Sequence, residues 1–159
     1  DLLENYGGHF YAAGMTLKPE NVPAFQERFE EVVATTIDPD LLIPEITIDT
    51  EISLKDITPA FFNILKQFEP LGPDNQRPIF LVRNVVDSGY SRLIKDEHIK
   101  FSVKQGKHAI AVTGIGFYMA DKFPIVSSRQ PFDMVFTIDE NEWNGKMNLQ
   151  MKVIDIRSH

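Results

Sequence analysis

The sequence MVFTIDENEWNGKMNLQMKV, residues 134–153, decides the fold class of this chain. Apolar side chains recur at every second position on each side of its centre: Met134, Phe136 and Ile138, then Met147, Leu149, Met151 and Val153. This spacing predicts strands with one buried face. Asn144-Gly145 lies between the two runs and is the strongest short signal for a hairpin turn. The stretch therefore predicts two antiparallel strands.

The preceding residues predict further strands. We expect a strand over residues 79–86, and a second hairpin in which Gln105-Gly106 joins a strand over 99–104 to one over 109–113. Gly114 and Gly116 indicate a bulge or a close backbone approach. About five strands in this half favour a small closed β-barrel, and an OB-type barrel is the leading candidate among several barrel types that fit.

The first half of the chain predicts helices and single strands. Residues 12–17 fit a short buried strand, and residues 22–36 carry apolar side chains at helical spacing after Pro19. Alternation over residues 46–54 predicts a strand with one buried face, and Thr58 with Pro59 predicts the start of another helix. The fold class is therefore α+β. We expect one part over residues 1–40 and a second over 41–159, with strand, helix and link in 41–78 and the barrel in 79–159.

Composition excludes cysteine chemistry and a membrane-spanning helix. The chain has no cysteine, which excludes disulfides, thiolate catalysis and cysteine-ligated zinc. No apolar run reaches the roughly 20 residues that span a bilayer, so we expect a soluble, cytoplasmic protein without a membrane partner.

The charges are unevenly distributed. Residues 1–75 contain 4 Lys/Arg and 14 Asp/Glu, whereas residues 76–159 contain 12 and 9. Five cations fall within a short stretch of the second half: Arg92, Lys95, Lys100, Lys104 and Lys107. They indicate a phosphate-binding surface or, equally, an ordinary solvated strand face.

Gly7-Gly8-His9 is a candidate phosphate-binding loop. Paired glycines let backbone N–H groups approach an anion, and the imidazole adds a hydrogen bond or a positive charge. A tight turn with an incidental histidine explains the same three residues.

Six segments of the chain resemble known sequences. GGHFYAAG at residues 7–14 resembles the signature of the DHH-associated domain of DHH-family phosphodiesterases. The remaining segments resemble RecJ-type single-strand-specific DNA exonucleases in their order: FEPLGPDNQRPIF at 68–80, GKH at 106–108, IGF at 115–117, NEWNG at 141–145 and IDIR at 154–157.

The resemblance implies a 5′-to-3′ exonuclease of DNA repair and recombination that acts on single-stranded DNA. Residues 1–40 would end the DHH-associated domain, and 41–159 would form an OB-type single-strand-binding domain. Mn²⁺ or Mg²⁺ would be held by an N-terminal DHH domain preceding Asp1, so we expect no cofactor in this fragment and no activity from it alone. Gly7, Gly8 and His9 would hold the phosphate, with His9 stabilising charge that develops at the scissile bond.

Single-strand binders combine a basic track with aromatic rings on which bases stack. The candidates for the track are Arg92, Lys100, Lys104, Lys107, His108 and Lys146. The candidates for stacking are Tyr90, Tyr118 and Trp143, each of which has a packing role as its alternative.

Two other functions fit the same residues. The barrel could dock a protein, such as the single-strand-binding protein or another repair factor, with the basic stretch receiving an acidic tail. The chain could also belong to a DHH phosphodiesterase that acts on small nucleotides, although an attached barrel favours an extended strand.

Overall fold

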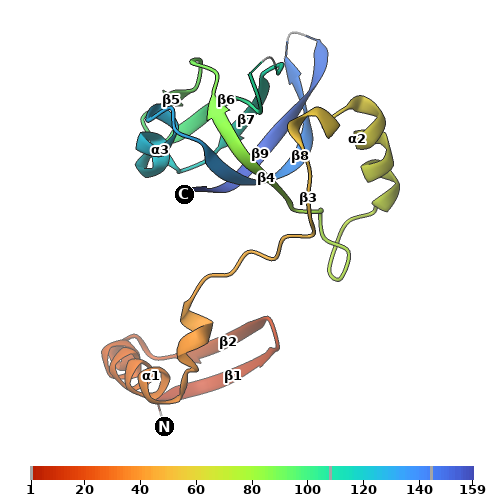
Figure 1. Ribbon diagram of the computed structural model, residues 1–159. Helices are drawn as coiled ribbons and strands as arrows, with labels where there is room; N and C mark the ends of the chain where they lie inside the picture. The colour runs from red at the N-terminus through yellow and green to blue at the C-terminus, as the bar shows by residue number, and fades with distance from the viewer. Residues whose placement is uncertain (1, 108, 144) are drawn as a thin grey trace. The chain divides into compact units, whose positions relative to one another are not determined.

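The computed structural model describes residues 2–107, 109–143 and 145–159, and gives only the backbone of residues 142, 143 and 146. The chain forms two compact units, residues 1–46 and 47–159, shown in Figure 1. No helix among the described residues is long and apolar enough to cross a membrane.

The first unit is a hairpin followed by a helix. Strands β1 (Leu3–His9) and β2 (Ala12–Leu17) pair antiparallel, and helix α1 (Val22–Thr36) confirms the helix predicted from apolar spacing. No described residue of this unit is buried, so the prediction of a buried strand at β2 is wrong. The rings of Phe25 and Phe29 stack on α1 with centroids 5.7 Å apart, and Phe29 is 55% exposed. The unit therefore has no core of its own.

The second unit contains a closed five-stranded barrel, which confirms the predicted OB-type fold. Its strands are β4 (Phe80–Asp87), β6 (His98–Lys104), β7 (Val112–Gly116), β8 (Phe132–Trp143) and β9 (Lys146–Ser158). Among the pairs that form this ring, β7 and β9 run parallel and the others antiparallel, and the β4–β6 pairing closes the ring β4-β8-β9-β7-β6. Two short strands, β3 (Thr50–Glu51) and β5 (Arg92–Ile94), extend it alongside β4 and β6.

The barrel core comes from the alternation seen in the sequence. Its largest fully buried side chains include Phe101, Phe132, Phe136, Met134 and Met151. Both predicted close approaches are confirmed, because a Cβ on Gly114 would lie 3.2 Å from the Met151 backbone oxygen and one on Gly116 would lie 2.9 Å from the Phe101 ring. Because Gly114 and Gly116 have no side chain, β7 packs closely against Met151 and Phe101.

A bulge in β4 is held by the buried Asp133. Val82 pairs with Met134 of β8 and Val85 with Phe132, so two residues of β4, Arg83 and Asn84, lie opposite the single residue Asp133. Val82 and Val85 therefore both face the core, and φ at Asn84 is 55°. Asp133, 4% exposed, accepts hydrogen bonds from Arg83 Nη1 at 2.9 Å and from the Asn84 backbone N–H at 3.1 Å. The charged pair therefore fixes a local irregularity that lets one strand bury both valines.

Two helices pack against the barrel, at opposite sides of it in Figure 1. Helix α2 (Pro59–Leu65) begins as predicted, with Thr58 Oγ1 accepting the Phe61 N–H at 3.2 Å, and it buries Phe62. Helix α3 (Phe123–Ser127) was not predicted, because five residues are too few to show helical periodicity. Its Val126 is fully buried.

The predicted strand over residues 46–54 is wrong in extent. Only Thr50–Glu51 pairs, parallel to β4, and the chain then enters a single 3-10 turn at Leu54–Asp56. Ile52 and Leu54 pack on the core as the alternation implied, but Ile46 and Ile48 are 38% and 39% exposed. Alternation marks extended backbone, whereas a strand also needs a partner along its whole length.

Candidate functional site

Strand β6 directs its side chains alternately into the barrel and out of it. The inward side chains are fully buried: Ile99, Phe101 and Val103. The outward side chains are partly exposed: His98, Lys100, Ser102 and Lys104. We call this outward row the β6 face.

Three predicted track cations lie on or beside the β6 face. Arg92 of β5 is directly opposite Lys100, and Lys104 lies two positions beyond Ser102 on the same side of the strand. Within the described parts of the chain, none of the three has an ion-pair partner. Like charges placed opposite each other destabilise a sheet, so an anion bridging Arg92 and Lys100 would relieve their repulsion. Lys107 is exposed in the turn that follows β6.

Tyr90 is presented on a loop that is anchored to the β6 face. Asp87 carboxylate oxygens accept the N–H groups of Gly89 at 2.9 Å and Ser91 at 3.1 Å. The Ser88 and Ser102 hydroxyls are 2.7 Å apart, and Ser91 Oγ accepts the Ser102 N–H at 2.9 Å. The Tyr90 side chain itself is 78% exposed. A fixed loop carrying an exposed ring suits stacking, because little backbone entropy is lost on binding.

Tyr118 lies at the opposite end of the β6 face. Its backbone N–H donates to His98 Nδ1 at 3.1 Å, and its ring meets the His98 ring edge-on with centroids 4.8 Å apart. The Phe117 ring also contacts His98, at 5.3 Å, and Phe117 and Tyr118 are 52% and 78% exposed. Both aromatics of this dipeptide are therefore accessible.

A groove of about 440 Å³ adjoins the β6 face. Its polar lining includes Lys100, Thr113, Asn141, Asn148 and Gln150, which come from β6, β7, β8 and β9. Sequence reasoning did not select the four uncharged residues. The sequence does place Asn148 and Gln150 on one face of β9, and the predicted hairpin places Asn141 opposite Asn148, but only the pairing of β7 with β9 brings Thr113 beside them.

Three cations that contact β8, namely Lys152, Arg77 and Lys66, are already paired. Asp139 Oδ2 lies 3.2 Å from Lys152 Nζ, and Asp139 Oδ1 lies 3.3 Å from Arg77 Nη1. Partial burial raises the pKa of Asp139, but the hydrogen bond from Lys152 and the charge of Arg77 outweigh it, so the pKa lies below its usual value. Glu140 likewise lies 2.6 Å from Lys66 Nζ. Arg92, Lys100 and Lys104 thus differ from these three cations, because they have no such partner among the described residues.

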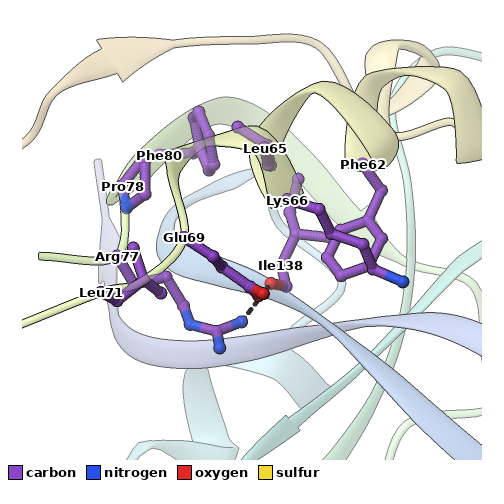
Figure 2. Close-up of a pocket in the computed structure, with 9 residues that line it drawn as sticks. All are labelled: Phe62, Leu65, Lys66, Glu69, Leu71, Arg77, Pro78, Phe80 and Ile138. Atoms are coloured by element: carbon purple, nitrogen blue, oxygen red, sulfur yellow. Dashed lines mark hydrogen bonds between the residues drawn. The ribbon is translucent and has the colours of Figure 1, made fainter.

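A small pit separates α2 from the barrel, as Figure 2 shows. Arg77 Nη1 donates to the Ile138 carbonyl oxygen at 3.0 Å, and Lys66 Nζ lies 5.0 Å from the centre of the Phe62 ring. The pit has a volume of about 20 Å³. That is room for about one water molecule, so the pit is a packing contact and not a substrate site.

The Gly-Gly-His segment lies in the first unit. The expectation of a loop is wrong, since Gly7, Gly8 and His9 end strand β1 and the turn is formed by Phe10-Tyr11. Pairing with β2 explains the difference: a Cβ on Gly8 would lie 2.6 Å from the Ala12 carbonyl oxygen, so glycine permits the close approach. His9 is exposed, and its Nδ1 accepts the Tyr11 N–H at 3.2 Å.

Three predicted site residues have no described side chain. His108 lies outside the described residues, and Trp143 and Lys146 are described only as backbone partners in the β8–β9 ladder. Among the described residues, no three His, Asp or Glu side chains form a group able to hold a metal ion.

Comparison with known proteins identifies similar chains. A family profile described as the RecJ OB domain matches residues 48–155. The chain is 28% identical over 156 residues to the single-stranded-DNA-specific exonuclease RecJ of Bacillus subtilis and 26% identical over 159 residues to that of Escherichia coli. Each alignment covers 98% of this chain.

Solved structures show the same similarity. The crystal structure of RecJ in complex with Mn²⁺ from Thermus thermophilus matches 99% of this chain with a TM-score of 0.72 and 26% identity. The chain spans only 22% of that protein, and 20% and 26% of the Bacillus and Escherichia relatives. The similarity therefore covers nearly the whole of this chain and a minor part of each relative.

Proposed function

Because the chain belongs to the RecJ OB domain family, we propose that it is the substrate-binding part of a 5′-to-3′ single-stranded-DNA exonuclease of DNA repair and recombination. The β6 face would hold the strand. A cytoplasmic location, where such an enzyme meets DNA, is part of this proposal.

One observation carries the proposal: aromatic and cationic groups alternate along the β6 face. Tyr118 on His98 comes first, then Lys100 with Arg92, then Tyr90 on the loop bound to Ser102, and finally Lys104. Successive outward positions on a strand are roughly 6.8 Å apart. A single strand lying along β6 would thus meet rings for its bases and cations for its phosphates in turn.

Hydrolysis would require residues beyond this chain. Mn²⁺ and Mg²⁺ are named in complexes of the Thermus protein, and such an ion would stabilise charge on the phosphoryl oxygens. Among the described residues, no three His, Asp or Glu side chains form a group able to hold such an ion, and the contribution that we propose for this chain is binding. Gly7 and Gly8 would let the end of β1 approach a phosphate, and His9 would hydrogen-bond to it near the scissile bond.

The first prediction concerns Lys100 and Lys104. Replacing both by glutamate should weaken binding of a fluorescent oligothymidylate at least tenfold in roughly 0.1 M salt, because two attractive charges become repulsive. The slope of log affinity against log salt should fall by about 0.7 for each phosphate that is no longer neutralised. Fluorescence anisotropy over a salt series measures both quantities.

Lys18→Glu combined with Lys55→Glu is the matched control. Both lysines are exposed and belong to neither β5 nor β6, and the net charge changes equally. If both variants weaken oligothymidylate binding equally, the loss of affinity comes from the change in overall charge and not from the β6 face. If the affinity of the unsubstituted chain does not change with salt, protein docking is favoured. If this chain alone shortens the oligonucleotide, the proposal that it binds DNA but does not cut it is wrong.

A further inference from the structure

The groove beside the β6 face has a lining unlike that of the face itself. Among the described residues, the side chains of Thr113, Asn141 and Gln150 accept and donate no hydrogen bond within the protein. Thr113 is cross-strand neighbour to Ser102, so the lining begins where the β6 face ends. Apolar contacts from Val112 and Leu149 complete this part of the groove. The groove therefore offers uncharged hydrogen-bonding groups over a partly apolar surface.

Its electrostatics disfavour phosphates. Asp139 is directly opposite Gln150, and Asn141 lies two positions further along β8. The nearby Lys152 is already paired with Asp139. Lys100 is the one cation among the described residues that line the groove, so a phosphate on Lys100 would meet an unpaired cation, whereas a phosphate among Thr113, Asn141 and Gln150 would meet none.

The chemistry suits nucleobases. An Asn or Gln carboxamide carries two donors and an acceptor on one planar group, which matches the donor and acceptor pattern on a base edge. Since the amide can turn over and exchange its donor and acceptor, one residue can serve different bases. A hydroxyl such as that of Thr113 is equally adaptable.

We propose that this groove receives the bases of a single strand whose phosphates lie on Lys100 and Lys104, an inference that rests on the proposed function. Asn141 and Gln150 hydrogen-bond to base edges, and Thr113 adds a third contact. Binding then has two separable components: a salt-dependent one on the β6 face and a base-dependent, sequence-tolerant one in the groove.

The test uses two oligonucleotides of equal length, oligothymidylate and an abasic strand with the same phosphates. Asn141→Ala with Gln150→Ala should weaken oligothymidylate binding about tenfold, the value of two ordinary hydrogen bonds. The slope of affinity against salt should stay unchanged, because every cation that faces a phosphate is still present. Affinity for the abasic strand should also stay unchanged.

Two further variants make the test specific. Gln67→Ala with Gln130→Ala removes two exposed amides that do not line this groove and should change neither affinity. Thr113→Val keeps the shape and strand preference of the side chain, so it should fold normally and weaken only oligothymidylate binding, about threefold.

The outcomes separate the two proposals. Equal weakening for both strands, an altered salt slope, or full affinity in both groove variants overturns the groove assignment and leaves the β6 face intact. If the unsubstituted chain binds neither strand, the proposed function fails together with the inference.

Discussion

Gly116 lies where the barrel has no room for a side chain. A Cβ there would meet the Met119 sulfur at 2.5 Å and the fully buried Phe101 ring at 2.9 Å. Gly116→Ala should therefore destabilise the chain by about 1–3 kcal/mol, the usual cost of overpacking a core. Gly72→Ala is the control, since nothing lies within 4 Å of its Cβ position. Urea unfolding of both variants measures the difference in free energy of unfolding. Equal values would show that the Met119 side chain moves aside without destabilising the fold.

Individual residues differ in how far the sequence predicts them. Lys100 and Lys104 were selected because cations alternating with buried residues must share the outer side of one strand. Asn141 and Gln150 were not, because neutral polar residues on a strand give no pattern distinct from ordinary solvent exposure. The predicted hairpin brings these two residues close together, but the groove also needs Lys100 of β6 and Thr113 of β7, whose position beside them local spacing does not encode.

At the scale of elements, Asp139 links β8 to its neighbours. Its carboxylate lies between Lys152 of β9 and Arg77, which precedes β4. Since its pKa is lowered in the folded chain, the carboxylate stabilises the fold above the unfolded value of about 3.9 and loses that effect as the pH falls through the folded value.

Asp139→Asn should accordingly lower the free energy of unfolding at neutral pH by up to about 1 kcal/mol, the range for partly exposed pairs. The difference from the unsubstituted chain should shrink as the pH falls through the lowered folded-state pKa of Asp139, where the carboxylate becomes protonated. Urea unfolding at pH values of about 7, 5 and 3 tests this, with Asp96→Asn as a control at an exposed position. Parallel stability profiles across this pH range would contradict the expectation.

Elements were predicted best where periodicity was long. The runs in β6, β8 and β9 and in α1 are long enough to distinguish strand from helix. Helix α3 and strand β3 are five and two residues long, and tertiary partners define both. The bulge at Arg83-Asn84 also escaped prediction, because it depends on Asp133, which is far away in the sequence.

At the scale of the whole molecule, the two units differ in what holds them together. The barrel unit contains every buried residue among those described, whereas the hairpin and α1 have exposed apolar side chains on both elements, including Met15 and Phe29. Isolated helices of about 15 residues are marginal in water, and pieces near roughly 40 residues usually need disulfides or metals to fold. With no cysteine, the first unit has no disulfide to support it.

Residues 47–159 should therefore unfold at the same temperature as the complete chain and keep the salt-dependent oligothymidylate binding of the β6 face, while losing the proposed phosphate contact of His9. Residues 1–46 alone should show no cooperative thermal transition, because no described residue of that unit is buried. Circular dichroism of the two pieces and anisotropy on the longer one provide the measurements. A cooperative transition in the short piece would mean that the first unit has stability that its own contacts do not explain, and loss of the salt dependence in the long piece would mean that the β6 face is not the salt-dependent binding surface.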